Sequence, residues 1–228
     1  MSNLEITNDN LPLVLAVDTS SAIAGYALAR GETLLASING DAAVPHSRAF
    51  FLQITELLNS AGVSLNDVQL FVVATGPGSF TGLRVGLAAV KGLAQVLGKP
   101  LLGVNTFDAV ALATKVTGDL LVLIEAGRRE VYFGFRRMTE AGLVESTGED
   151  LVGTPEKLLN LIPDGQVITG SVSETILASR PDLRFCPVSS TPAEAIALYA
   201  PKLLAFGMAS SLRPHYVRPS DAEIKRKD

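Results

Sequence analysis

The sequence is poor in charge, cysteine and histidine. Asp, Glu, Lys and Arg make up 18% of its 228 residues, against about 25% in an average globular domain. One cysteine, Cys186, excludes an internal disulfide framework. Two histidines, His46 and His215, limit any histidine-based metal site, and we expect no metal centre.

Long apolar runs and basic segments are also missing. No run of about 20 apolar residues predicts a membrane span, and the first ten residues carry acids instead of the basic start of a signal peptide. A net charge of −4 disfavours autonomous binding to nucleic acid, which usually needs a basic patch. We therefore expect a cytoplasmic protein that makes no contact with a membrane. With 47% hydrophobic residues and a mean hydropathy of +0.32, the chain is too apolar for intrinsic disorder.

Short apolar runs alternate with helical periodicities along the chain. Both halves follow the pattern β-β-β-α-β-α and share little sequence, which predicts an α/β fold of two similar lobes. We expect the first lobe over 1–105, the second over 106–212 and a polar, mobile tail over 213–228. The patterns place helices at 47–60, 83–97, 107–115, 155–161, 173–179 and 192–206.

A glycine-rich segment, Thr75–Gly86, lies between an expected strand and an expected helix. Glycines allow close backbone approach, and a helix N-terminus offers free N–H groups to an anion. The segment is neither a Walker A loop nor a Rossmann fingerprint, and a tight, capped turn is the alternative interpretation. With the turn that ends the first strand, it gives a candidate nucleotide or anion site of Asp18, Thr19, Ser20, Gly76, Gly78, Ser79 and Thr81.

The helix behind this segment is apolar nearly all round. On a wheel of about 100° per residue, Arg84, Lys91 and Gln95 share an arc of roughly 40°, and the remaining residues are Leu, Val, Ala or Gly. Glycines at every fourth position would let another helix approach closely. We expect the helix to pack on its own sheet and also against a partner; burial between the protein's own lobes is the alternative. Together with the preceding helix, it gives a candidate partner interface of Phe50, Phe51, Ile54, Gly82, Val85, Gly86, Ala89, Val90 and Leu93.

Several strings, VLAVDTSS, HSR and GPGSFTGLRVGLAAVKGLA, followed by EVYFGFR and PHYVRPSDAE, resemble the TsaB (YeaZ) family. The resemblance implies the duplicated α/β fold of the actin and sugar-kinase type of ATPase. It also implies a non-catalytic scaffolding or dimerisation subunit of the machinery that makes N6-threonylcarbamoyladenosine in tRNA, next to the anticodon. The implied partners are a TsaD-like transferase paralogue, bound through helices of the first lobe, and a TsaE-like ATPase. Alone, such a chain pairs with itself through the same surface, and we expect it to reach tRNA only through the complex.

The resemblance also bears on catalysis. The transferase paralogue holds a metal through a His-x-x-x-His motif, whereas this sequence has His46 followed by Phe50, so no catalytic residue is carried over. In the second hairpin Glu125, Ala126 and Gly127 stand where the family pattern is closer to Asp-Ala-Arg. We expect no tightly bound cofactor, with ATP or ADP at a subunit interface as the candidate. Two rival functions stay open: an autonomous ATPase or small-molecule kinase of the same fold, and a metal-dependent peptidase.

Overall fold

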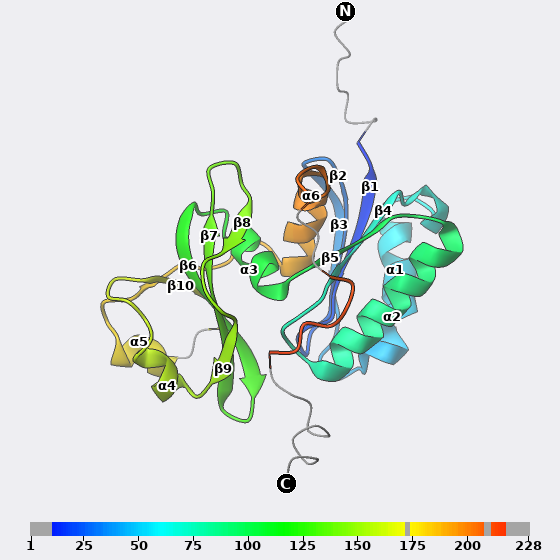
Figure 1. Cartoon of the computed structure of the whole chain (residues 1–228). Helices are drawn as coiled ribbons and strands as arrows, with labels where there is room; N and C mark the ends of the chain where they lie inside the picture. The colour runs from blue at the N-terminus through cyan, green and yellow to red at the C-terminus, as the bar shows by residue number, and fades with distance from the viewer. Residues whose placement is uncertain (1–10, 172–173, 208–210, 218–228) are drawn as a thin grey trace, which may run out of the picture.

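The computed structural model describes residues 11–171, 174–207 and 211–217, which form two lobes side by side (Figure 1). The first lobe is built on a five-stranded sheet of order β3-β2-β1-β4-β5. Strands β2 and β3 are antiparallel neighbours, whereas β4 and β5 run parallel to β1. The strands are β1 (Leu13–Asp18), β2 (Gly25–Arg30), β3 (Thr33–Asn39), β4 (Leu70–Ala74) and β5 (Leu101–Val104).

The second lobe repeats this topology in a sheet of order β11-β10-β6-β7-β8, with the short β9 also paired to β7. Here too the first hairpin is antiparallel and the two later strands are parallel to its first strand. This match confirms the predicted duplication of the α/β pattern. The strands are β6 (Gly118–Gly127), β7 (Glu130–Met138), β8 (Val144–Ser146), β9 (Leu151–Gly153), β10 (Val167–Gly170) and β11 (Arg184–Phe185).

The helices form three layers around the two sheets (Figure 1). Helices α1 and α2 cover the outer face of the first sheet, α3 and α6 lie between the sheets, and α4 and α5 pack on the second sheet. The helices are α1 (His46–Ser60), α2 (Phe80–Leu97), α3 (Thr106–Thr114), α4 (Pro155–Leu159), α5 (Glu174–Ser179) and α6 (Pro192–Ala205), with a short 3-10 turn η2 at Leu65–Asp67.

The middle layer joins the lobes. One hydrophobic cluster contains side chains of both sheets together with α3 and α6. Helix α6 lies within the range expected for the second lobe, yet it packs on β1 and β2 of the first sheet as well as on α3. The two lobes therefore share one core.

Two local expectations are corrected. Helix α2 begins at Phe80 instead of Leu83, because the Ser79 hydroxyl caps it by accepting a hydrogen bond from the Gly82 N–H at 3.2 Å. The expectation of a mobile tail is wrong for Arg213–Val217, which returns to the first lobe and donates the His215 N–H to the Thr75 carbonyl at 2.7 Å. The rest of the expected tail, 218–228, lies outside the described residues.

Helix α2 is the one helix in the described part of the chain that is long and apolar enough to cross a membrane. It packs against β1, β4, β5 and α1. Its buried side chains include Leu83, Leu87 and Val90. This packing is that of a helix covering one face of an α/β lobe.

Candidate functional site

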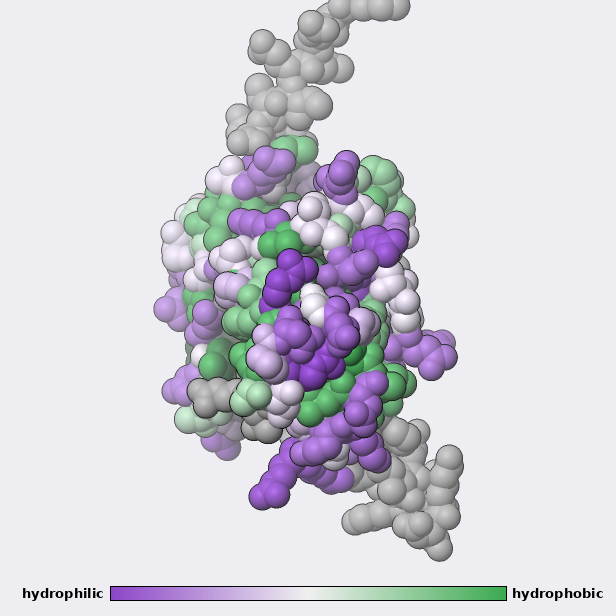
Figure 2. Space-filling model, turned by 90° about the vertical axis from the view of Figure 1, so that its left-hand side faces the viewer, coloured by the Kyte–Doolittle hydropathy of each residue, from purple (hydrophilic) through white to green (hydrophobic). Residues whose placement is uncertain are grey.

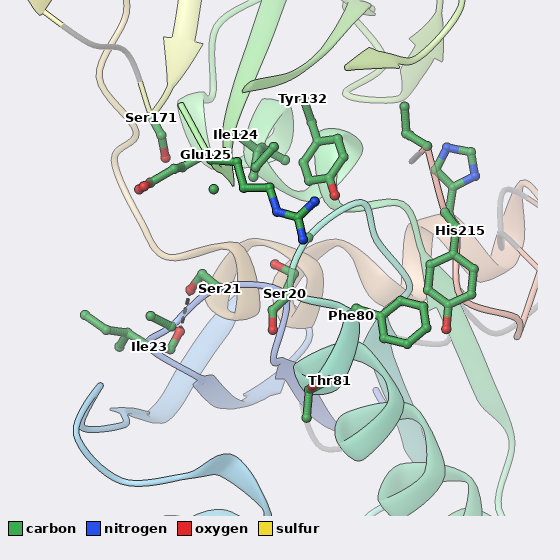
Figure 3. Close-up of a pocket in the computed structure, with 18 residues that line it drawn as sticks. Ser20, Ser21, Ile23, Phe80, Thr81, Ile124, Glu125, Tyr132, Ser171 and His215 are labelled. Carbon is green, nitrogen blue, oxygen red and sulfur yellow. Dashed lines mark hydrogen bonds between the residues drawn. The ribbon is translucent and has the colours of Figure 1, made fainter. Parts of the chain in front are cut away.

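A pocket of about 870 Å³ opens between the lobes. Figure 3 shows its walls: Ser20, Ser21 and Ile23 from the end of β1, Phe80 and Thr81 from the start of α2, and Ile124, Glu125, Tyr132 and Ser171 from the second lobe. His215, Tyr216 and Val217 close one side. The glycine-rich segment and the second hairpin thus face each other across one cavity.

The glycines on the first-lobe side of the pocket are required by close contacts inside the chain. A Cβ at Gly78 would lie 2.3 Å from the Ser20 carbonyl oxygen, and one at Gly86 would lie 2.1 Å from Thr19 Oγ1. The Ser79 N–H donates to the Ser20 carbonyl at 2.6 Å, and the Thr19 hydroxyl donates to the Gly82 carbonyl at 2.8 Å. The four-residue spacing of these glycines therefore brings α2 onto the β1 turn, and our interpretation of it as a partner contact is corrected.

The turn after β1 supplies the floor of the pocket. The buried Asp18 carboxylate accepts the Ser20 N–H at 2.8 Å. Burial raises the pKa of Asp18, and the hydrogen bonds from Ser20 and the charge of His46 oppose that rise without cancelling it. His46 Nε2 lies 2.9 Å from the Ser21 carbonyl oxygen. These contacts fix the turn against the start of α1.

The structure divides the predicted nucleotide or anion site into two layers. Pocket-lining positions are Ser20, Gly78, Ser79 and Thr81. The other three predicted residues, Asp18, Thr19 and Gly76, are buried behind them. The wall thus presents hydroxyl groups and the N-terminus of α2, a combination able to hydrogen-bond an anionic or hydroxyl-rich ligand.

The facing wall is the β6–β7 hairpin. Glu125, Ala126, Gly127 and Arg128 line the pocket. Arg128 and Arg129 have φ of 55° and 60°, so a tight turn with two left-handed residues places the arginines at its tip. The pocket therefore carries one acidic and one basic side chain from this wall.

No group of three or more His, Cys, Asp or Glu side chains within the described ranges is placed to hold a metal ion. Phe50, at the second histidine position of the paralogue motif, is 1% exposed and packs edge-on against Tyr26 with 5.7 Å between ring centroids. That position of α1 thus contributes to the core of the first lobe.

A buried ion network lies beside the pocket, and sequence analysis did not single it out. Arg136 is 1% exposed; its Nε donates to Asp108 Oδ1 at 2.6 Å and its Nη1 to Asp150 Oδ1 at 2.8 Å. Burial alone would lower the pKa of Arg136, but hydrogen bonding to Asp150 and the charges of both carboxylates raise it. The sequence signal for this network is one charged residue, Arg136, at the end of the largely apolar string EVYFGFR.

The same network reaches the C-terminal segment. His215 Nε2 lies 3.0 Å from Asp150 Oδ2. Burial raises the pKa of Asp150, but hydrogen bonds from His215 and Arg136 and the charge of Arg136 outweigh it and hold the pKa at about 2. Asp150 is therefore ionised at neutral pH, so His215 Nε2 is the donor.

The predicted partner interface is also divided by burial. Phe51 is 59% exposed, and Val85, Ala89 and Leu93 are partly exposed. The other five predicted residues are buried in the chain's own fold: Phe50, Ile54, Gly82, Gly86 and Val90. The four accessible residues thus remain available for the predicted contact.

The outer side of α2 has an uncharged surface that includes two of these residues, Val85 and Ala89. On a wheel of about 100° per residue, an arc of roughly 100° contains Thr81, Val85, Ala88, Ala89, Gly92 and Val96. Val96 is 85% exposed, and a Cβ at Gly92 would meet no atom within 4 Å. We call these six residues the α2 face. The second-lobe end of the molecule differs, because hydrophilic and hydrophobic residues are interspersed there (Figure 2).

Comparison with known proteins places these features in a family. Over residues 40–224 the chain matches the family model described as TsaD: tRNA N6-adenosine threonylcarbamoyltransferase. It is 33% identical over 138 residues to the tRNA threonylcarbamoyladenosine biosynthesis protein TsaB of Bacillus subtilis, a match covering 60% of each chain. The matched region spans about three fifths of the length of this and other curated relatives.

Solved structures agree with the fold. YeaZ from Pseudomonas aeruginosa is similar with a TM-score of 0.73 and 26% identity, over 90% of this chain and 100% of that one. Component A of the Acidaminococcus fermentans (R)-2-hydroxyglutaryl-CoA dehydratase, at 12% identity and a TM-score of 0.56 over 85% and 99% of the chains, shares the fold alone. The predicted duplicated α/β fold of the actin and sugar-kinase type is confirmed.

Proposed function

Because the chain belongs to the TsaB (YeaZ) family, we propose that it takes part in making N6-threonylcarbamoyladenosine in tRNA. Its proposed role is that of a non-catalytic scaffold that binds and activates a TsaD-like transferase. The observation that carries this proposal is the α2 face, which is uncharged and accessible over about 100° of a helix. Contiguous exposed apolar surface of this kind marks protein–protein contact sites.

The proposed contact lies on the outer side of the first lobe. The α2 face and the exposed Phe51 on α1 supply small and apolar groups. In the absence of the transferase, the same surface would pair two copies of this chain. A TsaE-like ATPase is the proposed third member of the complex, and the net charge of −4 supports contact with tRNA through the partners.

The proposal is tested with Gly92→Arg, placed at the centre of the α2 face. A Cβ at position 92 would meet no atom within 4 Å, so we expect the monomer to stay folded while a charge enters the contact. We expect the variant to lose co-elution with the TsaD-like protein of the same source in gel filtration. The matched control is Gln95→Arg, which adds the same charge on the exposed polar side of α2. Co-elution of Gly92→Arg at the wild-type level would overturn the proposal.

The rival candidate is an autonomous nucleotide-dependent enzyme. The pocket of about 870 Å³ favours it, with the Ser20 hydroxyl from the turn after β1 and the Ser79 and Thr81 hydroxyls at the start of α2. Asp18, a residue of the candidate nucleotide or anion site, is buried and accepts the Ser20 N–H, which fits a triphosphate–metal complex poorly. Calorimetry of the isolated chain with ATP and Mg²⁺ decides: sub-micromolar binding with steady turnover favours the enzyme. Weak binding that appears only with the transferase present favours ATP or ADP at a subunit interface.

We propose that the protein works in the cytoplasm, in keeping with a tRNA-modifying role.

A metal-dependent peptidase is the third candidate function. A metal-dependent peptidase would need a bound metal, and elemental analysis of the purified protein that finds a stoichiometric metal would revive that reading.

A further inference from the structure

The segment Leu212–Val217, which we call the strap, contacts both lobes beside the pocket. In Figure 1 it is the red trace that passes between the sheets near the start of α2. His215 makes one contact in each direction: its N–H donates to the Thr75 carbonyl of the first lobe at 2.7 Å, and its ring donates to Asp150 of the second lobe at 3.0 Å. A single residue therefore links the end of β4 to the loop before β9.

The strap is fixed along the polar side of α2. Arg84 Nε donates to the Tyr216 hydroxyl at 2.9 Å, and the guanidinium carbon lies 3.7 Å from the centre of the Phe80 ring. The Phe80 and Tyr216 rings lie 4.8 Å apart. Lys91 Nζ donates to the Leu212 carbonyl. Two of the three long polar side chains on α2 thus hold the chain's own C-terminal segment.

The second-lobe end of the strap is equally well supported. Asp150, the acceptor for His215, is held by the buried Arg136 and by Asn105 Nδ2 at 3.3 Å. Val217 packs against the hydrophobic cluster shared by both sheets. The strap is therefore anchored to α2 on one side and to the ion network around the buried Arg136 on the other.

We infer that the strap is an interlobe clamp that sets the opening of the pocket. Three of its residues, His215, Tyr216 and Val217, form a wall of that pocket, so the lobes cannot separate on that side while both His215 contacts persist. Two-lobed proteins close and open about hinges of a few loop or element-terminal residues, and a contact that bridges the two lobes limits such a motion. The inference does not depend on the proposed function, because it concerns the geometry of the isolated chain.

The clamp is tested by measuring the distance between the lobes. In the full chain carrying Cys186→Ser, spin labels are attached at Asn59→Cys on α1 and at Glu140→Cys after β7, two exposed positions. Double electron–electron resonance is then recorded with and without His215→Ala. We expect the substitution to shift the distance distribution to longer values and to broaden it.

Two variants make the result specific. Arg213→Ala, an exposed neighbour in the same segment, should leave the distribution as it is in the parent. His215→Gln, which keeps an N–H donor in the side chain, should restore part of the narrow distribution. An unchanged distribution in His215→Ala overturns the inference, and so does equal broadening by Arg213→Ala, because the effect would then be independent of the contact with Asp150.

Discussion

The contact between α2 and the β1 turn leads to a prediction in which one substitution has opposite effects at two positions of one helix. Replacing glycine by alanine in a helix interior is favourable by about 0.8–1.0 kcal/mol on propensity alone. At Gly92 the added methyl meets no atom within 4 Å. Gly92→Ala is therefore expected to stabilise the protein by about 1 kcal/mol.

At Gly86 the same methyl would lie 2.1 Å from Thr19 Oγ1 and 3.2 Å from its Cβ. Overpacking of this kind costs about 1–3 kcal/mol. Displacing the Thr19 hydroxyl also breaks its hydrogen bond to the Gly82 carbonyl, which adds about 1 kcal/mol. When the gain in helix propensity is subtracted from these two costs, Gly86→Ala is expected to destabilise the protein by about 1–3 kcal/mol.

The assay is urea unfolding followed by far-UV circular dichroism, a suitable probe because the chain has no tryptophan. The two alanine variants should differ by about 2–4 kcal/mol at equal slope. A double-mutant cycle adds Thr19→Ala, which vacates the space that the new methyl needs. The double variant should be more stable than the two single losses predict. Equal stability of Gly86→Ala and Gly92→Ala, or strict additivity in the cycle, would refute the reasoning.

Three more predictions concern buried charge, acid stability and capping. Arg136→Met leaves two partly buried carboxylates, Asp108 and Asp150, without the buried cation between them and should cost about 3–5 kcal/mol in the same titration. A loss of about 1 kcal/mol or less, as for an exposed pair, would contradict it. The pKa of Asp150 in the folded protein, about 2, lies below the ordinary 3.8. Ionised Asp150 therefore adds about 2 kcal/mol to the free energy of unfolding above about pH 4. This contribution is lost as the pH falls toward 2. Asp150→Asn should flatten that part of the stability–pH curve, and an unaltered curve counts against the pair. Thr191→Ala removes the cap of α6, whose hydroxyl accepts the Glu194 N–H at 3.2 Å; calorimetry should show a lower Tm from a loss of about 1 kcal/mol, and an unchanged Tm would rule out that role.

Most of the order of helices and strands was predictable because most elements have a strong local signal; the three-residue strand β9 and the short turn η2 were not expected. The apolar run before Asp18 predicts β1, and the periodicity of Phe50, Ile54 and Leu57 predicts α1. The sequence pattern predicts the start of α2 too late, since glycines at 78 and 82 suggest a loop. Their real cause is contact with residues about 60 positions earlier in the chain, which no local pattern contains.

The site was only partly predictable for the same reason. The turn after β1 and the hydroxyl groups that line the pocket are recognisable in the sequence, because both lie in short continuous segments. The pairing of Asp150 with His215 is not, since 65 residues separate them and neither lies in a periodic pattern. The polar side of α2 is visible on the helix wheel, and the structure supplies its reason: Arg84 and Lys91 bind the strap.

The position of α6 has a consequence for synthesis of the chain. Its alanines cover Val14 and Ala27 on the inner face of the first sheet, although α6 is translated about 90 residues after that sheet is complete. Chains emerge from the ribosome N-terminal part first. The inner, apolar face of the first sheet therefore stays uncovered until α6, which ends at residue 205, has been synthesised. A fragment ending near 105 would keep that face exposed permanently, and we expect it to aggregate where the full chain folds.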